Sequence, residues 1–239
     1  MEKIMKAFII VVLLTISISL IAQGTPTPVQ STTPETKSTK ASPQKETTPV
    51  QPETPVAQPA QILSQVVPPD FRKVNWGMTI AQAKATEPAK PIREAGLGSK
   101  KILVYEDQVA GLSCDVVYIF VKDKLVRAKY LVTSKHTNNN QYLSDFYSLA
   151  ESLENKYGKP TSDNKFWKSD LYKDSPNDWG LAVAAGHLAQ YKEWKNSKTN
   201  LIIGLSGDNY EIDLVIEYWS TELYSLEEQA DKEEEQNKL

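Results

Sequence analysis

The amino-acid sequence predicts an α+β domain: an antiparallel sheet with two helices packed on one face, built from tandem units in which a helix precedes a strand meander. Three observations predict this fold class. A helical apolar period runs through residues 142–157, apolar and polar residues alternate in segments before and after it, and the turns between those segments are short. Short turns favour antiparallel pairing, because parallel strands need long crossover connections.

The first 24 residues, MEKIMKAFIIVVLLTISISLIAQG, have the layout of a secretory signal peptide. Lysines near the start precede an apolar run from Ala7 to Ala22, and small residues precede a cut after Gly24. The run is shorter than the roughly 18–20 residues that cross a bilayer comfortably. The alternative is an uncleaved signal anchor that tethers the protein to the inner membrane. Both interpretations predict an extracytoplasmic protein, periplasmic or secreted.

Residues 25–69 are predicted to form a disordered, low-complexity linker. Thr, Pro, Gln, Lys and Glu dominate this segment, which holds ten of the chain's 14 prolines and no aromatic residue. It therefore cannot bury enough apolar surface to offset its chain entropy. All five tryptophans lie at or after Trp76. We place the folded domain at residues 70–223 and an acidic charged tail at residues 224–239.

The stretch NWGMTIAQAKATEP predicts the first helix of the domain. Trp76 is a large apolar anchor, and Gly77 gives the chain freedom to turn. Thr79 and Gln82 have the spacing of a capping box, in which each side chain bonds the other residue's backbone. The helix is expected over residues 80–87, because a proline follows directly.

Three strands are expected after a loop over residues 88–99. They lie at 101–106, 111–122 and 124–134, and the sequence VKDK supplies the tight turn between the last two. Cys114, the chain's only cysteine, falls on the apolar side of the second strand. It is therefore predicted to be a buried, unreactive thiol, and no intrachain disulfide can form.

The second helix is the clearest element of the sequence. Asn139 or Asn140 can cap its start, and Gly158 with Pro160 ends it. Its apolar residues recur at intervals of three and four, as expected for a helix with one buried side. These residues are Tyr142, Phe146, Leu149, Leu153 and Tyr157.

About four strands are expected after this helix. Their segments are NKFWKS, LAVAAGHLAQYKEWK, TNLIIGLSG and YEIDLVIEYWS. In the last segment apolar residues alternate with acids, which predicts a sheet with one buried and one solvated face. The acidic tail beyond it is predicted to be a frayed, solvated helix end.

The sequence contains no recognisable motif for catalysis, metal binding or cofactor binding. His136 lies in a polar loop and His187 inside a predicted strand, and neither belongs to a motif such as G-x-S-x-G or H-E-x-x-H. The Asp-rich segment 162–178 lacks the glycine and closing glutamate of a calcium loop. We therefore predict no catalytic residue, no cofactor and no metal site, and a protein that is not an enzyme.

Charge limits the expected partners. The chain carries a formal net charge of −3. The excess negative charge lies in the acidic C-terminal end, and residues 71–220 by themselves carry about +2. This leaves no basic stripe of the kind that nucleic-acid binding requires. Nucleic acid is therefore excluded as a partner, and membrane contact is expected only through an uncleaved signal anchor.

One face of the predicted sheet is a candidate partner-binding face. Alternation directs one apolar set toward the helices. This set is Val116, Tyr118, Phe120, Val126, Ala128, Tyr130, Leu214, Ile216 and Tyr218. The residues that alternate away from it are Val117, Ile119, Arg127, Lys129, Glu217 and Trp219. Aliphatic, charged and Trp side chains together suit a protein contact, because Trp and Arg are enriched in hot spots. The alternative is an ordinary solvated sheet face.

Two short motifs carry a family resemblance. The pattern F-x-x-x-x-W-G-M-[ST]-x-x-[QE], here from Phe71 to Gln82, and the KYGKP after the second helix resemble a family of small, uncharacterised exported bacterial proteins. More distantly, the tandem plan resembles β-lactamase-inhibitor-protein-like folds, which include the small lipoprotein of the outer-membrane barrel-assembly machine. The resemblance covers residues 70–220 and implies a fold. The lipoprotein's lipidated cysteine and the inhibitor's disulfides are missing here, so membrane attachment is not implied.

These features predict an exported cell-envelope binding or assembly module without catalytic activity, with another envelope protein as the expected partner. Two alternatives stay open. The first is an envelope structural or stress protein, or a carrier of a small apolar ligand between the helices and the sheet. The second is an enzyme whose site has no recognisable motif.

Overall fold

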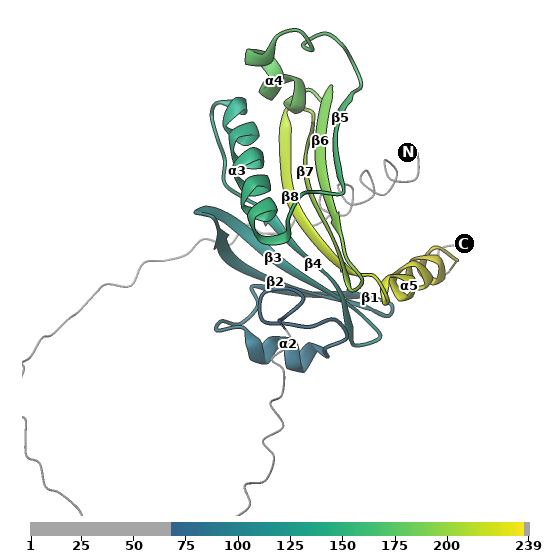
Figure 1. Ribbon diagram of the computed structural model, residues 1–239. Coiled ribbons are helices and arrows are strands. Elements are labelled where there is room, and N and C mark those ends of the chain that lie inside the picture. The colour runs from purple at the N-terminus through teal and green to yellow at the C-terminus, as the bar shows by residue number, and fades with distance from the viewer. Residues whose placement is uncertain (1–67, 237–239) are drawn as a thin grey trace, which may run out of the picture. The chain divides into compact units, whose positions relative to one another are not determined.

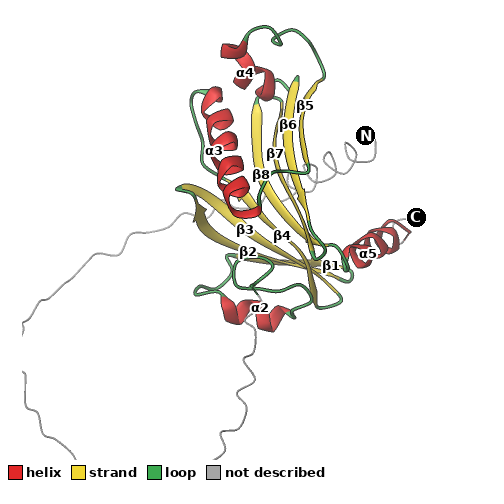
Figure 2. Cartoon of the chain, viewed as in Figure 1, coloured by secondary structure: helices red, strands yellow, loops and turns green. Residues whose placement is uncertain are grey.

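The computed structural model describes residues 68–236 (Figure 1). The predicted signal peptide and nearly all of the predicted linker lie outside the described residues. Figure 2 shows the helices and strands. The helices are α2 (Ile80–Thr86), α3 (Asn139–Tyr157), the short 3-10 helix η1 (Pro176–Asp178), α4 (Trp179–Ala184) and α5 (Tyr224–Gln236). The strands are β1 (Arg93–Leu97), β2 (Lys100–Val109), β3 (Leu112–Val121), β4 (Lys124–Val132), β5 (Ser162–Trp167), β6 (Leu188–Lys195), β7 (Thr199–Asp208) and β8 (Glu211–Ser220).

The eight strands form one antiparallel sheet in the order β1-β2-β3-β4-β8-β7-β6-β5. The predicted α+β class with an antiparallel sheet is confirmed. Residues 93–97, predicted as loop, form the edge strand β1. Each run of four strands starts at an edge of the sheet and ends at its centre, where β4 pairs with β8. Lys129 faces Glu217 across this central pair, so side chains from distant parts of the sequence share one surface.

Tight two-residue turns connect β2 to β3, β3 to β4 and β7 to β8. Two successive residues with positive φ angles are characteristic of type I′ turns, whose twist matches that of an antiparallel ribbon. The VKDK turn predicted from the sequence is one of them. The central residues of the three turns are Ala110 and Gly111, Lys122 and Asp123, and Asn209 and Tyr210, with φ between 48° and 82°.

The Trp-Gly-Met segment joins the first helix to the sheet. Gly77 has a φ of +81°, and its N–H donates to the carbonyl of Leu125 at 2.9 Å. The Trp76 indole N–H donates to the Thr199 hydroxyl at 2.8 Å. The predicted capping box is confirmed, because both hydrogen bonds of the Thr79 cap are present. The motif therefore ties the first helix to β4 and to the start of β7.

Helix α3 buries the apolar stripe that the sequence predicts, with two differences at its ends. Its cap is Asn138, one residue earlier than expected, and the Asn138 side chain accepts a hydrogen bond from the Asn140 N–H at 3.0 Å. Tyr157 is 37% exposed, because it lies on the last turn, although its ring contacts that of Tyr218. Gly158 ends the helix as predicted. The buried stripe consists of Tyr142, Phe146, Leu149 and Leu153.

One predicted strand is partly a helix. The segment LAVAAGHLAQYKEWK was expected to be extended throughout, but it contains the end of α4, a turn at Gly186 (φ +71°) and β6. Ala182, Val183 and Ala184 are fully buried, and a short, wholly apolar run does not distinguish a buried helix from a buried strand. His187 therefore lies in the turn before β6 and not inside a strand.

Gly180 of α4 packs directly against the start of α3. A Cβ atom at this position would overlap the backbone of Asn139 and Asn140, which cannot move without separating the two helices. We expect Gly180→Ala to lower the free energy of unfolding by about 1–3 kcal/mol, the usual effect of overpacking, as measured by urea unfolding. Gly96→Ala is the control, since its Cβ would mainly meet the flexible side chain of Lys101. An equal loss in both variants would contradict this assignment.

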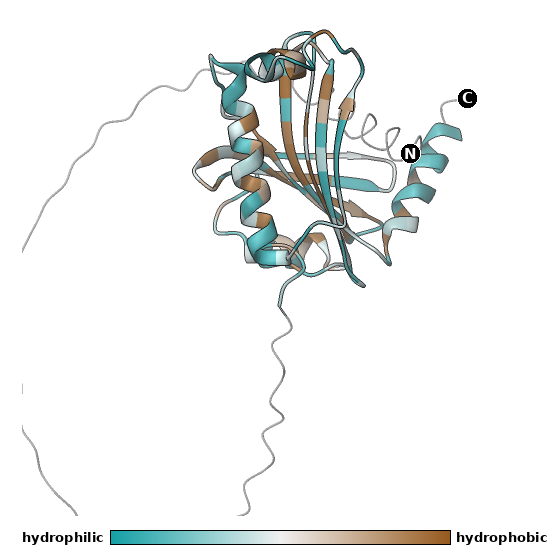
Figure 3. Cartoon of the chain, turned by 45° about the horizontal axis from the view of Figure 1, so that its top comes forward, coloured by the Kyte–Doolittle hydropathy of each residue, from teal (hydrophilic) through white to brown (hydrophobic). Residues whose placement is uncertain are grey.

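Buried side chains form two clusters, one on each face of the sheet. The inner cluster contains residues of α2, α3 and α4 and of both halves of the sheet. The outer cluster joins β2, β3 and β4 to α5. Figure 3 shows the central strands as mostly hydrophobic and α5 as mostly hydrophilic. The buried members of the outer cluster are Val104, Val117, Ile119, Val121, Val126 and Ala230.

Val126 belongs to the outer cluster, although simple alternation predicts it on the inner face. The register of β3 with β4 shifts between Ile119, which faces Arg127, and Phe120, which faces Leu125. Val126 is the extra residue of this β-bulge. Leu125 takes the inner position instead, where it is fully buried.

The C-terminal residues form a helix, as the sequence predicted, and this helix is mostly exposed except along one side. Tyr224–Gln236 form helix α5, in which Glu227 and Ala230 are buried. Leu223, Leu226 and Ala230 lie at positions i, i+3 and i+7 and pack against the outer cluster. This spacing gives a strongly acidic segment one apolar side, so the segment can dock on the sheet.

Candidate functional site

The six residues predicted as a binding face lie together in the structure. Two lie on each of three neighbouring strands, β3, β4 and β8, and they form two rows across the sheet. We call the sheet surface that carries them the outer face. One row is Val117, Lys129 and Glu217, and the other is Ile119, Arg127 and Trp219.

Helix α5 lies against part of the outer face. It contacts β3 and β4, and only Arg127 and Trp219 of the six residues are partly exposed. The expectation of a sheet face open to solvent is therefore corrected, since the chain's own C-terminal helix lies on it. Alternation along a strand cannot reveal which distant segment covers a face. The buried residues are Val117, Ile119, Lys129 and Glu217.

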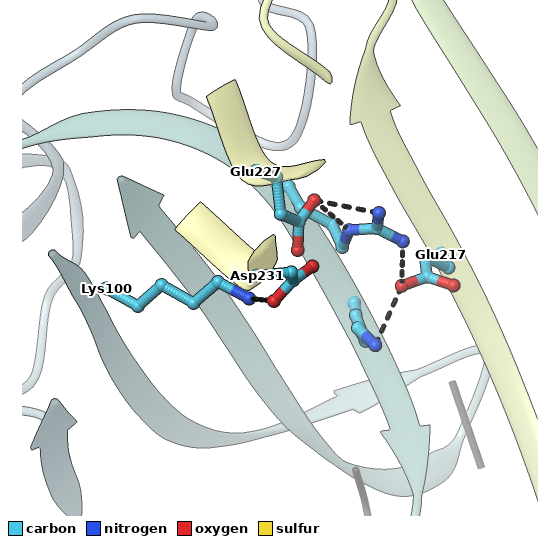
Figure 4. A network of polar contacts seen from close by, with 6 residues as sticks. Lys100, Glu217, Glu227 and Asp231 are labelled. Atoms are coloured by element: carbon cyan, nitrogen blue, oxygen red, sulfur yellow. Dashed lines mark hydrogen bonds and ion pairs between the residues drawn. The ribbon is translucent and has the colours of Figure 1, made fainter. Parts of the chain in front are cut away.

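A network of buried charges joins the outer face to α5 (Figure 4). Arg127 donates through Nε and Nη2 to Oε2 of Glu227 on α5, each at 2.8 Å. Through Nη1 it donates to Oε1 of Glu217 on β8, also at 2.8 Å. Lys129 Nζ lies 2.7 Å from the same Glu217 oxygen. Two cations and two carboxylates therefore balance one another, and α5 supplies one of the carboxylates.

The ion pairs of this network favour the ionised states of Glu217 and Arg127. Burial would raise the pKa of Glu217, which is 1% exposed, but Lys129 and Arg127 outweigh burial and lower this pKa to about 2. Burial also disfavours the charged form of Arg127, yet Glu217 and Glu227 raise the pKa of its guanidinium. Glu217 is therefore ionised at neutral pH and bridges both cations.

Acid is expected to destabilise the protein through Glu217. The pKa of this carboxyl is about 2 in the folded protein, against an ordinary value of 4.5. Its ionised form therefore stabilises the fold fully above pH 4.5, and this contribution is lost as the pH falls toward 2. The shift corresponds to a loss on the order of 3 kcal/mol. Urea unfolding over this range measures the loss, and Glu217→Gln should show a flatter pH dependence; the same slope in both proteins would contradict the assignment.

Aromatic rings flank the buried network. The Arg127 guanidinium lies 5.7 Å from the ring centroid of Trp219 and 5.6 Å from that of Tyr224. Both distances are within the range of cation–π attraction. Trp219 and Tyr224 therefore contact the same cation from the sheet and from the first turn of α5.

Two further ion pairs connect the sheet to α5 at the rim. Lys100 of β2 pairs with Asp231 of α5 (Figure 4). Lys122, in the β3–β4 turn, lies 3.7 Å from Glu233, and both side chains are more than half exposed. In these pairs, as between Arg127 and Glu227, the cation comes from the sheet and the carboxylate from the helix. Asp231 and Glu233 are exposed, as the sequence predicted for the acidic tail, whereas Glu227 is buried.

A second polar cluster ties the entry segment of the domain to β2 and β3. Arg72 Nη1 lies 2.6 Å from Asp107, and Arg72 Nη2 lies 3.3 Å from Glu87. The Tyr118 hydroxyl donates to Glu87, and burial together with this bond raises the pKa of Tyr118. These contacts fix the residues on either side of α2 against the sheet.

The cysteine and both histidines make structural contacts. Cys114 is buried on β3, and burial raises the pKa of its thiol to about 11, so the reactive thiolate is scarce at neutral pH. His136 Nε2 lies 2.5 Å from Asp145 of α3. The His187 ring stacks on Tyr172 with centroids 5.7 Å apart. Each of these histidine contacts connects a loop or turn to a neighbouring segment.

Within residues 68–236, no three His, Cys, Asp or Glu side chains lie close enough to hold a metal ion. One surface hollow lies at the base of α5, where Trp76, Ser220 and Leu223 meet, and a second lies before α3. Neither hollow contains a histidine or the cysteine. In the same described part of the chain, no helix is long and apolar enough to cross a membrane.

No protein-family model matches this chain, and no significant match to a curated protein or a solved structure was found. The functional interpretation therefore rests on the residues of the outer face and of α5.

Proposed function

We propose that this protein is an exported binding or assembly module of the cell envelope, without catalytic activity, that binds an envelope protein through its outer face. The pattern of Lys, apolar and small residues in the first 24 residues supports export. The Pro- and Thr-rich residues that follow suit a spacer, which would let the domain reach a partner away from the membrane if the signal remains as an anchor.

One observation carries the proposal: the outer face already binds a helix. Helix α5 docks through apolar contacts to the outer cluster and through ion pairs to β2, to β4 and to the β3–β4 turn. A surface that combines aliphatic side chains with Arg127 and Trp219 has the composition of a protein-binding hot spot. The same chemistry would serve a helix from another protein.

The proposal includes tandem units with α2 and α3 on one face of the sheet. The strand order supports it, because both runs of four strands lead from an edge to the centre. The presence of Ala83 of α2 and Phe146 of α3 in the same inner cluster supports a shared face. We propose on this basis that the chain has the architecture of the β-lactamase-inhibitor-protein-like folds that its sequence resembles.

Export is tested by the intact mass of the protein recovered from the envelope and the culture medium. A chain that begins at Thr25 is expected if the signal is cleaved, and a chain that retains Met1 in the membrane fraction would establish the anchor. Protein confined to the cytosol would refute export.

Binding is tested by photocrosslinking in intact cells. A photoreactive amino acid at Trp219, which is partly exposed on the outer face, is expected to capture a specific envelope protein. The control position is Tyr210, which is 73% exposed in the β7–β8 turn. Equal capture from the two positions, or no capture from Trp219, would contradict the proposed face.

A further inference from the structure

Helix α5 is held on the sheet mainly by charge. Its apolar contribution is small, because only Leu223, Leu226 and Ala230 pack against the outer cluster and the two leucines are only partly buried. By contrast, Glu227 and Asp231 each bind a cation of the sheet. Apolar burial is the main source of tight packing in proteins, so we expect α5 to be held less firmly than the helices that pack in the inner cluster.

The helix also depends on the sheet for its own structure. It has 13 residues, and helices of this length are marginal in water without tertiary contacts. Its rim pairs are screened by salt. Local opening therefore involves few apolar contacts, and elements of this kind open at lower free energy than the core.

Departure of α5 would leave an unbalanced positive charge on the outer face. Arg127 would keep only Glu217, whose Oε1 atom is already shared with Lys129, so two cations would face one carboxylate. Lys100 would lose its carboxylate partner at the same time. A segment that replaces α5 must therefore supply at least one carboxylate to Arg127. A second carboxylate, placed at Lys100, would restore both ion pairs that α5 made with these two cations.

Departure would also expose an apolar surface that requires a matching apolar side. The aliphatic residues beneath α5 come from β2, β3 and β4. The residues of the C-terminal segment that meet this surface define the pattern that a replacement helix needs. Apolar residues lie at 223, 226 and 230, and acids lie at 227 and 231, which gives the pattern L-x-x-L-E-x-x-A-D. Leu223 directly precedes α5, and the other four positions lie on one side of the helix, since they are spaced by three or four residues.

We propose that α5 is a displaceable occupant of the outer face, and that the partner of this protein presents an acidic amphipathic helix that takes its place. This inference rests on the proposed binding function and deepens it, because it names the class of partner and the way in which the chain itself controls access. The partner helix carries apolar and acidic residues with the spacing seen in α5. Its carboxylates replace those of Glu227 and Asp231 at Arg127 and Lys100.

The test uses the full chain with α5 loosened from its own side, so that the sheet surface is unchanged. Glu227→Lys with Asp231→Lys places cations against Arg127 and Lys100 and is expected to release the helix. Glu228→Lys with Glu235→Lys is the matched control, because it makes the same change of net charge on the same helix at two exposed positions. Hydrogen exchange of the amides in residues 224–236 reports release, which is expected in the variant changed at Glu227 and Asp231 and not in the control.

The binding probe is a fluorescent synthetic peptide with the sequence of residues 222–236. The loosened chain is expected to bind this peptide at least about tenfold more tightly than the wild-type chain and the control, in which α5 occupies the face. A peptide with Gln and Asn in place of the acids at 227 and 231 is expected to bind at least about tenfold more weakly, and salt is expected to weaken the original peptide.

Three results would overturn the inference. The first is release of α5 without binding of the peptide, and the second is equal affinity for the acidic and the neutral peptides. The third is a wild-type chain that forms dimers by exchanging α5, because this would assign the face to a second copy. A different result would refute the proposed function alone. In that case the peptide would bind as expected, but photocrosslinking from Trp219 would capture no specific envelope protein.

Discussion

Replacing Arg127 by Met is expected to lower the free energy of unfolding by about 3–5 kcal/mol, the range for removing one partner of a buried ion pair. The substitution keeps most of the apolar stem of the side chain. It leaves Glu217 with Lys129 alone and leaves Glu227 buried without its guanidinium partner. A buried carboxylate that has lost its partner retains the unfavourable free energy of desolvation. Urea unfolding followed by circular dichroism measures the loss.

Lys122→Met is the matched control for this substitution. It removes a cation next to the same strand, but its pair with Glu233 is 3.7 Å long and mostly exposed. Exposed ion pairs typically contribute about 0–1 kcal/mol, so the control should change the stability little. If Arg127→Met lost no more than Lys122→Met, the buried network would not be a source of stability.

Truncation of the α3 stripe is the second change with a large expected effect. Leu149 and Leu153 are 2% and 7% exposed and belong to the inner cluster. Leu149→Ala and Leu153→Ala should each lower the free energy of unfolding by about 2–5 kcal/mol, because a truncated buried leucine loses its transfer free energy and leaves a cavity. Thermal and urea unfolding both measure this loss.

The control for these truncations is Glu151→Ala, at an exposed position of the same helix. Surface substitutions of this kind usually stay within about 0.5 kcal/mol of the parent protein. Losses of this size at Leu149 and Leu153 would mean that α3 does not pack on the sheet through this stripe.

The features that the sequence predicted correctly are those set by neighbouring residues. The Thr79 cap, the Gly158 helix end and the VKDK turn each depend on contacts within a few positions along the chain. The stripe of α3 follows from the helical period alone. Errors appear where local pattern is ambiguous, as in the apolar run around Ala182, which fits a buried helix as well as a buried strand.

The candidate site was predictable in part. Alternation along three strands selected six residues, and the register brings all of them to one face. The same rule failed at Val126, because the bulge in β4 changes the count by one residue. The cover of the face was missed, although the spacing of Leu223, Leu226 and Ala230 is a readable signal of an amphipathic helix.

By itself the sequence determined the Thr79 cap, the Gly158 helix end, the VKDK turn and the apolar side of α3, because each depends on steric and hydrogen-bonding preferences of a short stretch. Only the tertiary structure decided that β4 lies beside β8 and that α5 returns to the sheet. Arg127 and Glu227 are 100 residues apart in the chain. Whether such a carboxylate is solvated or buried depends on which surface is free to receive it after the strands have paired, and no local pattern contains that information.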